Sequence, residues 1–143
     1  MGEILFSDLW VKGWGAKLSA SDIYRIAASK WEGDIVLVMD PDIGLGVTKR
    51  QAVYLDLWHG DCRDTRVATE EDEREAAYVI SASAHSWREI LEGSLDPIMA
   101  LMRGRLTLKK GSLASLLPYT SAAKELVVSA REVETIFPEE WSK

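Results

Sequence analysis

The sequence is poor in residues that form covalent cross-links or bind metals. Cys62 is the single cysteine among 143 residues, so neither an intramolecular disulfide nor a four-cysteine metal site can form. A lone thiol suits a reducing compartment, and we therefore expect a cytoplasmic protein. Histidine is almost as rare, since the chain has two, His59 and His85. These shortages predict a protein without a metal ion or other cofactor.

Basic charge is also scarce. The chain has 17 Lys and Arg residues against 23 Asp and Glu residues, a formal net charge of −6. Nucleic-acid binding and electrostatic docking on anionic membranes both need clustered positive charge, so neither is predicted. A small basic group at Arg103, Arg105, Lys109 and Lys110 is interpreted as the solvated edge of a strand.

Long apolar runs are missing as well. No segment reaches the roughly 18 apolar residues of a membrane span, so stable membrane insertion is not expected. The N-terminus has neither the basic region nor the apolar core of a secretion signal. The C-terminus, Trp141-Ser142-Lys143, is not a peroxisomal tail of the Ser-Lys-Leu type. Length and even composition predict one domain over residues 1–143.

Catalytic motifs are weak. Gly44-Leu45-Gly46 precedes a predicted strand rather than a helix, so it lacks the context of a dinucleotide-binding loop. His59 and Cys62 lie among aspartates at a turn, where a Cys–His pair or a metal site can be imagined. Turns are rich in Gly and Asp for conformational reasons, and we therefore predict no enzyme. A small enzyme that uses His59 and Cys62 remains an alternative hypothesis.

The N-terminal region is predicted to be helical. Ser7 is placed to cap a helix on which Trp10 and Trp14 share one face. Ser19 or Ser21 is placed to cap a second helix. We expect residues 1–32 to form this helical region and residues 33–143 to form the core of the domain.

Four strands are predicted next, from apolar runs and from alternation of apolar with polar residues. They cover residues 34–40, 48–58, 63–69 and 76–82. The acidic run 70–75 between the last two is interpreted as a solvated hairpin loop.

Helix signals punctuate the second half. Ser86 and Glu89 have capping-box spacing, and Asp96-Pro97 has a cap followed by proline at the first helical position. The remaining predicted elements are a strand at 105–109 and helices at 113–117 and 121–137. Strands that follow one another through turns favour an α+β domain, with a largely antiparallel sheet and helices on one face.

One part of the sequence is unusually apolar. Residues 111–123 contain no charged side chain, and residues 98–102 are continuously apolar. Such segments form either an ordinary core or the wall of a cavity. Met99 and Met102 would suit a cavity wall, because thioethers adapt to variable apolar partners. The residues by themselves leave both interpretations open.

The segment from Ala76 to about Leu117 resembles the sterol-carrier-protein-2 family. The resemblance rests on an ordered series of motifs: Ala77-Tyr-Val-Ile-Ser-Ala-Ser, Ser86-Trp87, Ile90-Leu91-Glu92-Gly93, Asp96-Pro97, Arg103-Gly104-Arg105-Leu106 and Leu108-Lys109-Lys110-Gly111. The resemblance implies a sheet of about five strands backed by helices, with an apolar tunnel between them. It also implies non-catalytic binding or carrying of a lipid-like ligand, such as a fatty acid, acyl-CoA, sterol or phospholipid.

Ten residues are predicted from these motifs to face the tunnel or the core beside it. They are Trp87, Ile90, Leu91, Ile98, Met99, Met102, Leu106, Leu108, Leu113 and Leu116. An interaction or oligomerisation module with a filled tunnel is the alternative within the same fold. In that case Trp10, Trp14 and Trp31 would form an interface patch, through which a homodimer could form.

Overall fold

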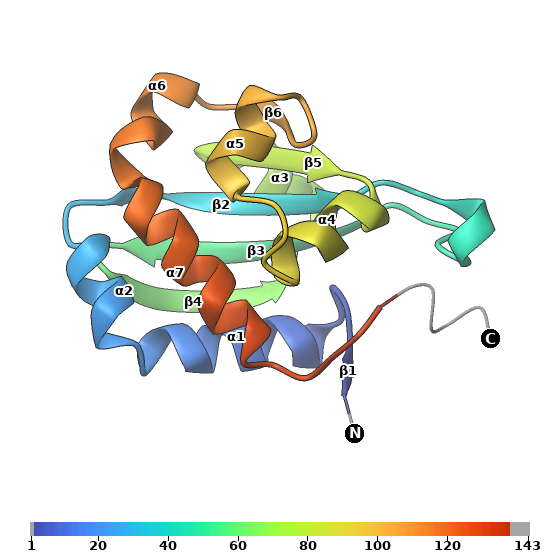
Figure 1. Cartoon of the computed structure of the whole chain (residues 1–143), viewed down its shortest axis with the longest axis horizontal. Helices are drawn as coiled ribbons and strands as arrows, with labels where there is room; N and C mark the ends of the chain where they lie inside the picture. Colours follow the sequence, from blue (N-terminus) through green and yellow to red (C-terminus); the bar gives the residue numbers. More distant parts are fainter. Residues whose placement is uncertain (1, 138–143) are drawn as a thin grey trace.

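The computed structural model describes residues 2–137, and its centre is a five-stranded sheet in the order β4-β3-β2-β5-β6 (Figure 1). Neighbouring strands run antiparallel, except that β2 and β5 are parallel. The predicted largely antiparallel sheet is thereby confirmed. The strands are β2 (Glu32–Met39), β3 (Gln51–Trp58), β4 (Asp61–Val67), β5 (Tyr78–Ala82) and β6 (Thr107–Lys110).

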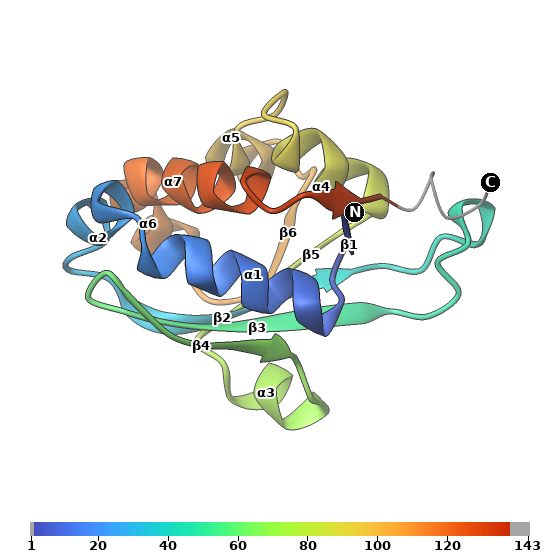
Figure 2. The ribbon, with the colours of Figure 1, turned by 90° about the horizontal axis from the view of Figure 1, so that it is seen from below.

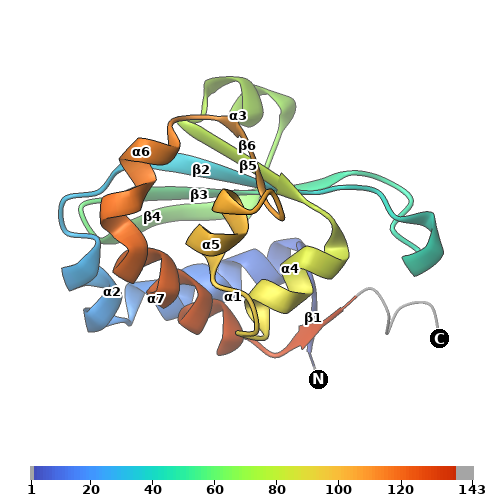
Figure 3. The ribbon, with the colours of Figure 1, turned by 45° about the horizontal axis from the view of Figure 1, so that its top comes forward.

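Helices cover one face of this sheet, as predicted for an α+β domain (Figure 2). They are α1 (Asp8–Ser19), α2 (Asp22–Ala27), α4 (Ala84–Leu91), α5 (Pro97–Met102), α6 (Leu113–Leu116) and α7 (Thr120–Arg131). The helix α3 (Glu70–Glu75) lies on the opposite face (Figures 2 and 3). The shorter elements are β1 (Glu3–Ile4), β7 (Thr135–Ile136) and the 3₁₀ turns η1 (Ile43–Leu45) and η2 (Leu117–Tyr119).

Side-chain caps define where several helices begin. The Ser7 and Ser21 hydroxyls accept hydrogen bonds from the third residue after each, which confirms both as N-caps. Asp96 likewise caps α5, with Pro97 at its first turn. The cap of α4 is Ser83, whose hydroxyl accepts from the Ser86 amide. The prediction that Ser86 begins this helix was therefore wrong by one turn.

The acidic run 70–75 is a helix, and the prediction of a hairpin loop was wrong. Thr69 accepts a hydrogen bond from the Asp72 amide, and the Asp72 carboxylate accepts one from the Thr69 amide. This reciprocal capping box satisfies two backbone donors at the start of α3. The acidic side chains also lie in the first turn, where the helix dipole favours negative charge.

The last helix is shorter than predicted. α7 ends at Arg131, and the chain continues into β7, which pairs with β1 in parallel. The Trp10 indole N–H donates a 2.9 Å hydrogen bond to the Thr135 hydroxyl and ties the two ends of the chain together. Pairing with β1 satisfies backbone groups that a longer helix would have satisfied within itself.

The predicted tryptophan interface patch is also wrong. Trp10, Trp14 and Trp31 are 1%, 4% and 6% exposed and belong to the core between the sheet and the helices. Their indole N–H groups all donate to nearby oxygen atoms, as large buried aromatic side chains with a polar atom require. The N-terminal helices therefore pack inward through their aromatic residues.

Candidate ligand-binding cavity

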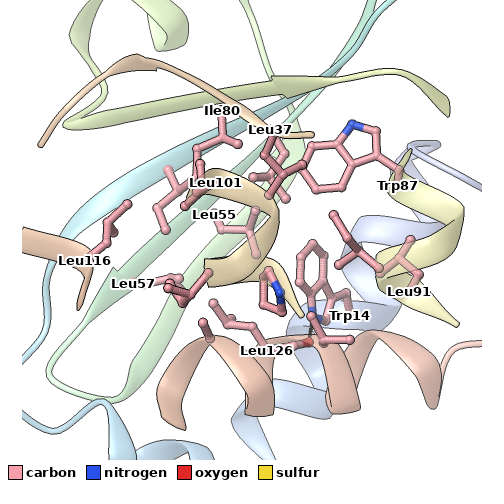
Figure 4. A pocket seen from close by; sticks show the side chains of 17 residues that line it. Trp14, Leu37, Leu55, Leu57, Ile80, Trp87, Leu91, Leu101, Leu116 and Leu126 are labelled. Carbon is pink, nitrogen blue, oxygen red and sulfur yellow. Dashed lines mark hydrogen bonds between the residues drawn. The ribbon is translucent and has the colours of Figure 1, made fainter. Parts of the chain in front are cut away.

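A cavity of about 110 Å³ lies between the sheet and the helices (Figure 4). Its volume is well above the roughly 10–15 Å³ needed for one water molecule. All seventeen residues that line it are apolar. They are Trp14, Ile35, Leu37, Leu55, Leu57, Ile80, Trp87, Ile90, Leu91, Pro97, Ile98, Leu101, Leu106, Leu116, Ala123, Leu126 and Val127.

The floor of the cavity comes from alternate residues of three strands. Side chains along a strand point to opposite faces in turn, so every second residue of β2, β3 and β5 faces the helices. Ile35 and Leu37 of β2 pair with Leu55 and Val53 of β3, and Ile80 of β5 pairs with Leu37. The residues between them, such as Val36, form a second small core on the α3 side.

The two polar atoms of the lining are already engaged. The Trp14 indole N–H donates a 2.9 Å hydrogen bond to the Leu126 carbonyl oxygen. The Trp87 indole N–H donates a 2.9 Å hydrogen bond to the Val38 carbonyl oxygen. No lining side chain therefore has a free hydrogen-bond donor or acceptor for a water molecule. Such a cavity favours apolar ligands.

A second cavity of about 50 Å³ adjoins the first toward α2. The two share six lining residues: Ile35, Leu57, Ile98, Leu116, Ala123 and Leu126. Tyr24 and Trp31 lie at the far end of the second cavity.

The structure brings six of the ten predicted site residues around the first cavity. Trp87, Ile90, Leu91, Ile98, Leu106 and Leu116 line it. Leu108 and Leu113 are half-buried and lie outside its lining, and Met99 and Met102 are 39% and 59% exposed. Helical geometry explains the methionines, because the residues of α5 that face the cavity are Pro97, Ile98 and Leu101.

Sequence reasoning missed the sheet floor and the contributions of two helices. Alternation within residues 34–40 and 48–58 was a usable signal for the floor, because one face of each strand had to meet the helices. Helical periodicity could place Trp14 of α1 and Leu126 of α7 on an apolar helix face but could not place either at this cavity. These two side chains reach the cavity from positions far apart in the sequence. Contact of any of these residues with a ligand remains a prediction.

His59 and Cys62 have separate partners. The His59 ring nitrogen Nε2 lies 2.6 Å from a Glu32 carboxylate oxygen, and the ring stacks on Trp58. The Cys62 sulfur lies 4.0 Å from the Asp64 carbonyl oxygen. Burial, together with the nearby Asp carboxylates, raises the pKa of the Cys62 thiol to about 11. A thiol with that pKa is a poor nucleophile at neutral pH.

The described part of the chain has neither a metal-binding cluster nor a membrane-spanning helix. Among residues 2–137, no group of three or more His, Cys, Asp and Glu side chains is arranged to hold a metal ion. None of the helices in that range is both long and apolar enough to cross a membrane.

Comparison with known proteins places this fold and its apolar cavity in a family. The model of the SCP-2 sterol transfer family matches residues 18–117, and the chain belongs to that family. A crystal structure of sterol carrier protein 2 is 51% identical over 90% of this chain and 98% of that one, with a TM-score of 0.82. The family resemblance and fold predicted from the sequence are thereby confirmed.

Other structures extend the comparison. A conserved hypothetical protein of Thermus thermophilus, described as a candidate sterol carrier protein, is 48% identical over 95% of this chain and 94% of that chain, with a TM-score of 0.84. Sterol carrier protein 2 of Aedes aegypti in complex with palmitate is 13% identical over 89% of this chain and 98% of that chain, with a TM-score of 0.54. The latter likeness concerns the fold. No curated protein matches the chain in sequence.

Proposed function

We propose that this protein binds and carries one lipid-like molecule, whose apolar chain occupies the cavity between the sheet and the helices. The observation that carries the proposal is the lining itself: seventeen apolar residues and no free polar group on their side chains. Burial of each methylene group of a ligand there would contribute about 0.8 kcal/mol, so affinity would grow with chain length.

The proposed ligand class is a single long acyl chain, as in a fatty acid or acyl-CoA. A lining without polar groups recognises length and shape rather than a particular head group. Membership of the sterol transfer family supports lipid binding, and the palmitate complex of the Aedes aegypti protein supports an acyl chain within this fold. No catalytic role is proposed.

The cavity must expand to hold such a chain. Pockets for drug-sized ligands typically measure about 300–1,000 Å³, whereas the two cavities measure about 110 and 50 Å³. We expect α5 to move outward during uptake, because it is a six-residue helix between Gly93 and Gly104, which both have positive φ. Ile98 and Leu101 of α5 face the cavity, so outward movement would enlarge it, at the cost of separating the buried Ile98 and Ala100 from the core.

The small volume also supports the competing hypothesis of an interaction module with a filled tunnel. Displacement of a fluorescent fatty acid, together with native mass spectrometry of the purified protein, separates the two. We expect one acyl chain per protein and affinity that rises with chain length. A protein that neither binds the fluorescent acyl chain nor retains lipid in native mass spectra would refute carrier function and favour the module.

Tryptophan fluorescence locates the ligand. Trp87 lines the cavity, whereas Trp58 is 38% exposed and lies outside both cavities. We expect Trp87→Phe to remove a large part of the emission change on binding, and Trp58→Phe to preserve it. The reverse pattern would place the ligand elsewhere on the protein.

A further inference from the structure

A second hollow lies on the opposite face of the sheet, beside α3. It is an open groove of about 560 Å³ between α3, the end of β2, the start of β3, strand β5 and the edge strand β6. Figure 2 shows α3 on the other side of the sheet from the helices that enclose the apolar cavity. The groove and the cavity are thus separated by the sheet itself.

The groove is positively charged in a chain whose net charge is −6. Four basic side chains line it, Arg50, Arg74, Lys109 and Lys110, against two acidic ones, Asp40 and Glu73. Clustered positive charge in a concave surface raises the local concentration of anions. The basic group foreseen as a solvated strand edge thus supplies part of a concave site, because β6 is an edge strand and α3 lies beside it.

Two of the four cations are already engaged with the protein. Arg50 makes a two-pronged ion pair with the Glu73 carboxylate, and the Lys110 ammonium donates a 2.6 Å hydrogen bond to the Arg74 carbonyl oxygen. The Arg74 guanidinium and the Lys109 ammonium have no ion pair or side-chain hydrogen bond within residues 2–137. They are the two cations in the groove that remain available to a ligand.

A buried hydroxyl points to the same ligand chemistry. Ser81 of β5 lines the groove and is 5% exposed, yet its hydroxyl has no hydrogen-bond partner among residues 2–137. The large majority of buried polar side-chain atoms have a partner, so an orphan hydroxyl calls for an explanation. A ligand oxygen in the groove would accept its hydrogen bond.

We propose that this groove binds a phosphate group, held by the Arg74 guanidinium, the Lys109 ammonium and the Ser81 hydroxyl. A phosphate presents several acceptor oxygens and a charge of about −1.5 to −2 near neutral pH, which suits one hydroxyl donor and two cations. The Asp40 carboxylate in the same groove opposes binding, and its repulsion limits the affinity. The phosphate belongs either to a soluble ester or to a phospholipid head group.

The experiment is a titration of the whole protein with inorganic phosphate, followed by amide chemical shifts in NMR at constant ionic strength. We expect saturable shifts at Ser81, Arg74 and Lys109. Binding should be tighter at pH 8 than at pH 5.5, because phosphate loses its second proton between these two pH values and then carries a charge close to −2. Shifts that are absent, do not saturate or spread over all basic side chains would overturn the proposal.

Charge-matched variants separate a site from general attraction. Arg74→Gln with Lys109→Gln should weaken phosphate binding at least tenfold. Arg103→Gln with Lys17→Gln removes the same charge from exposed positions outside the groove and should change binding less than twofold. Equal losses in both double variants would show a net-charge effect and refute the site.

The buried hydroxyl gives a second test. Ser81→Ala removes an unpaired polar group, so stability should be unchanged or higher while phosphate binding falls several-fold. Lower stability with unchanged binding would assign the hydroxyl a structural role and refute the proposal.

The last comparison identifies the source of the phosphate. Glycerol 3-phosphate represents a soluble ester, and phosphatidylcholine vesicles containing phosphatidic acid represent a head group. The probe that binds the unaltered protein but not the Arg74→Gln, Lys109→Gln variant represents the source of the phosphate. If the variant weakens binding of neither probe, the proposal is contradicted.

Discussion

Ala123 provides the most direct test of the apolar cavity. It lies on α7 and lines both the larger cavity and its neighbour, at the place where they adjoin. The change Ala123→Leu adds three carbon atoms to the side chain at this point. Leucine is also a good helix former, so α7 itself should tolerate the change.

The expected effects have opposite signs for binding and for stability. Three added carbons occupy the space of about three ligand methylenes, and at about 0.8 kcal/mol each the loss of binding free energy is about 2.4 kcal/mol. Since about 1.4 kcal/mol corresponds to a factor of ten, acyl-chain affinity should fall about 50-fold. Filling a void in the folded protein should meanwhile raise the free energy of unfolding by about 0.5–2 kcal/mol.

Both quantities can be measured on the same protein samples. Displacement of a fluorescent fatty acid reports affinity, and urea unfolding reports stability. Ala114→Leu is the matched control, because Ala114 is exposed on α6 and lines neither cavity. Unchanged affinity in Ala123→Leu, or an equal loss in Ala114→Leu, would refute binding in this cavity.

Three further predictions concern the thiol, an ion pair and a turn. The pKa of Cys62 is raised from 9.0 to about 11, so its thiolate fraction at neutral pH should be about 100-fold lower than that of an ordinary thiol. Labelling of Cys62 by a disulfide reagent should be correspondingly slow. Fast labelling at pH 7 would contradict the burial of the thiol. The hydrogen bond from Arg50 lowers the pKa of Glu73. The resulting stabilisation is present above the ordinary Glu pKa of 4.5 and is lost as pH falls through the lowered value. In Glu73→Gln the free energy of unfolding should therefore depend less on pH below about pH 5, with a difference of less than about 1 kcal/mol, and an identical profile in the variant would exclude the pair. Gly60→Ala should lower the free energy of unfolding measured in urea by about 1–3 kcal/mol. The reason is that Gly60 has φ +85° and the added methyl would meet a backbone carbonyl oxygen of α2. Gly46→Ala, at φ +81° with open space around it, should lower the free energy of unfolding less, and equal losses in the two variants would exclude that clash.

Short-range patterns in the sequence were sufficient to predict most of the helices and strands. The serine caps at Ser7 and Ser21 and the Asp96-Pro97 pair each act on backbone donors within a few residues, so a short stretch of sequence suffices to predict them. The mistakes at 70–75 and at Ser86 were also local. Thr69-x-x-Asp72 has the spacing of a helix cap, but the dense negative charge around it favoured a loop. Ser83 and Ser86 both had the chemistry of an N-cap, and the structure uses Ser83.

The apolar lining was only partly predictable. Residues such as Ile90 and Leu91 could be chosen because the motif around Trp87 and the helical period placed them on an apolar face. Met99 and Met102 were chosen for their chemistry, but α5 turns Leu101 inward and leaves both methionines exposed. Which face of a six-residue helix meets the sheet depends on how its neighbours pack.

The sequence by itself determined the α+β class, the order of the strands along the chain, most helix starts and membership of a lipid-carrier family. These depend on alternation, on caps and on the spacing of motifs, all of which act over short distances. The tertiary structure alone decided that Trp14 of α1 meets Leu126 of α7, that the lining side chains leave an apolar cavity, and that Ser81 lines the same groove as Arg74 and Lys109. A cavity is the space that packed side chains fail to fill, so it exists only once distant segments have come together.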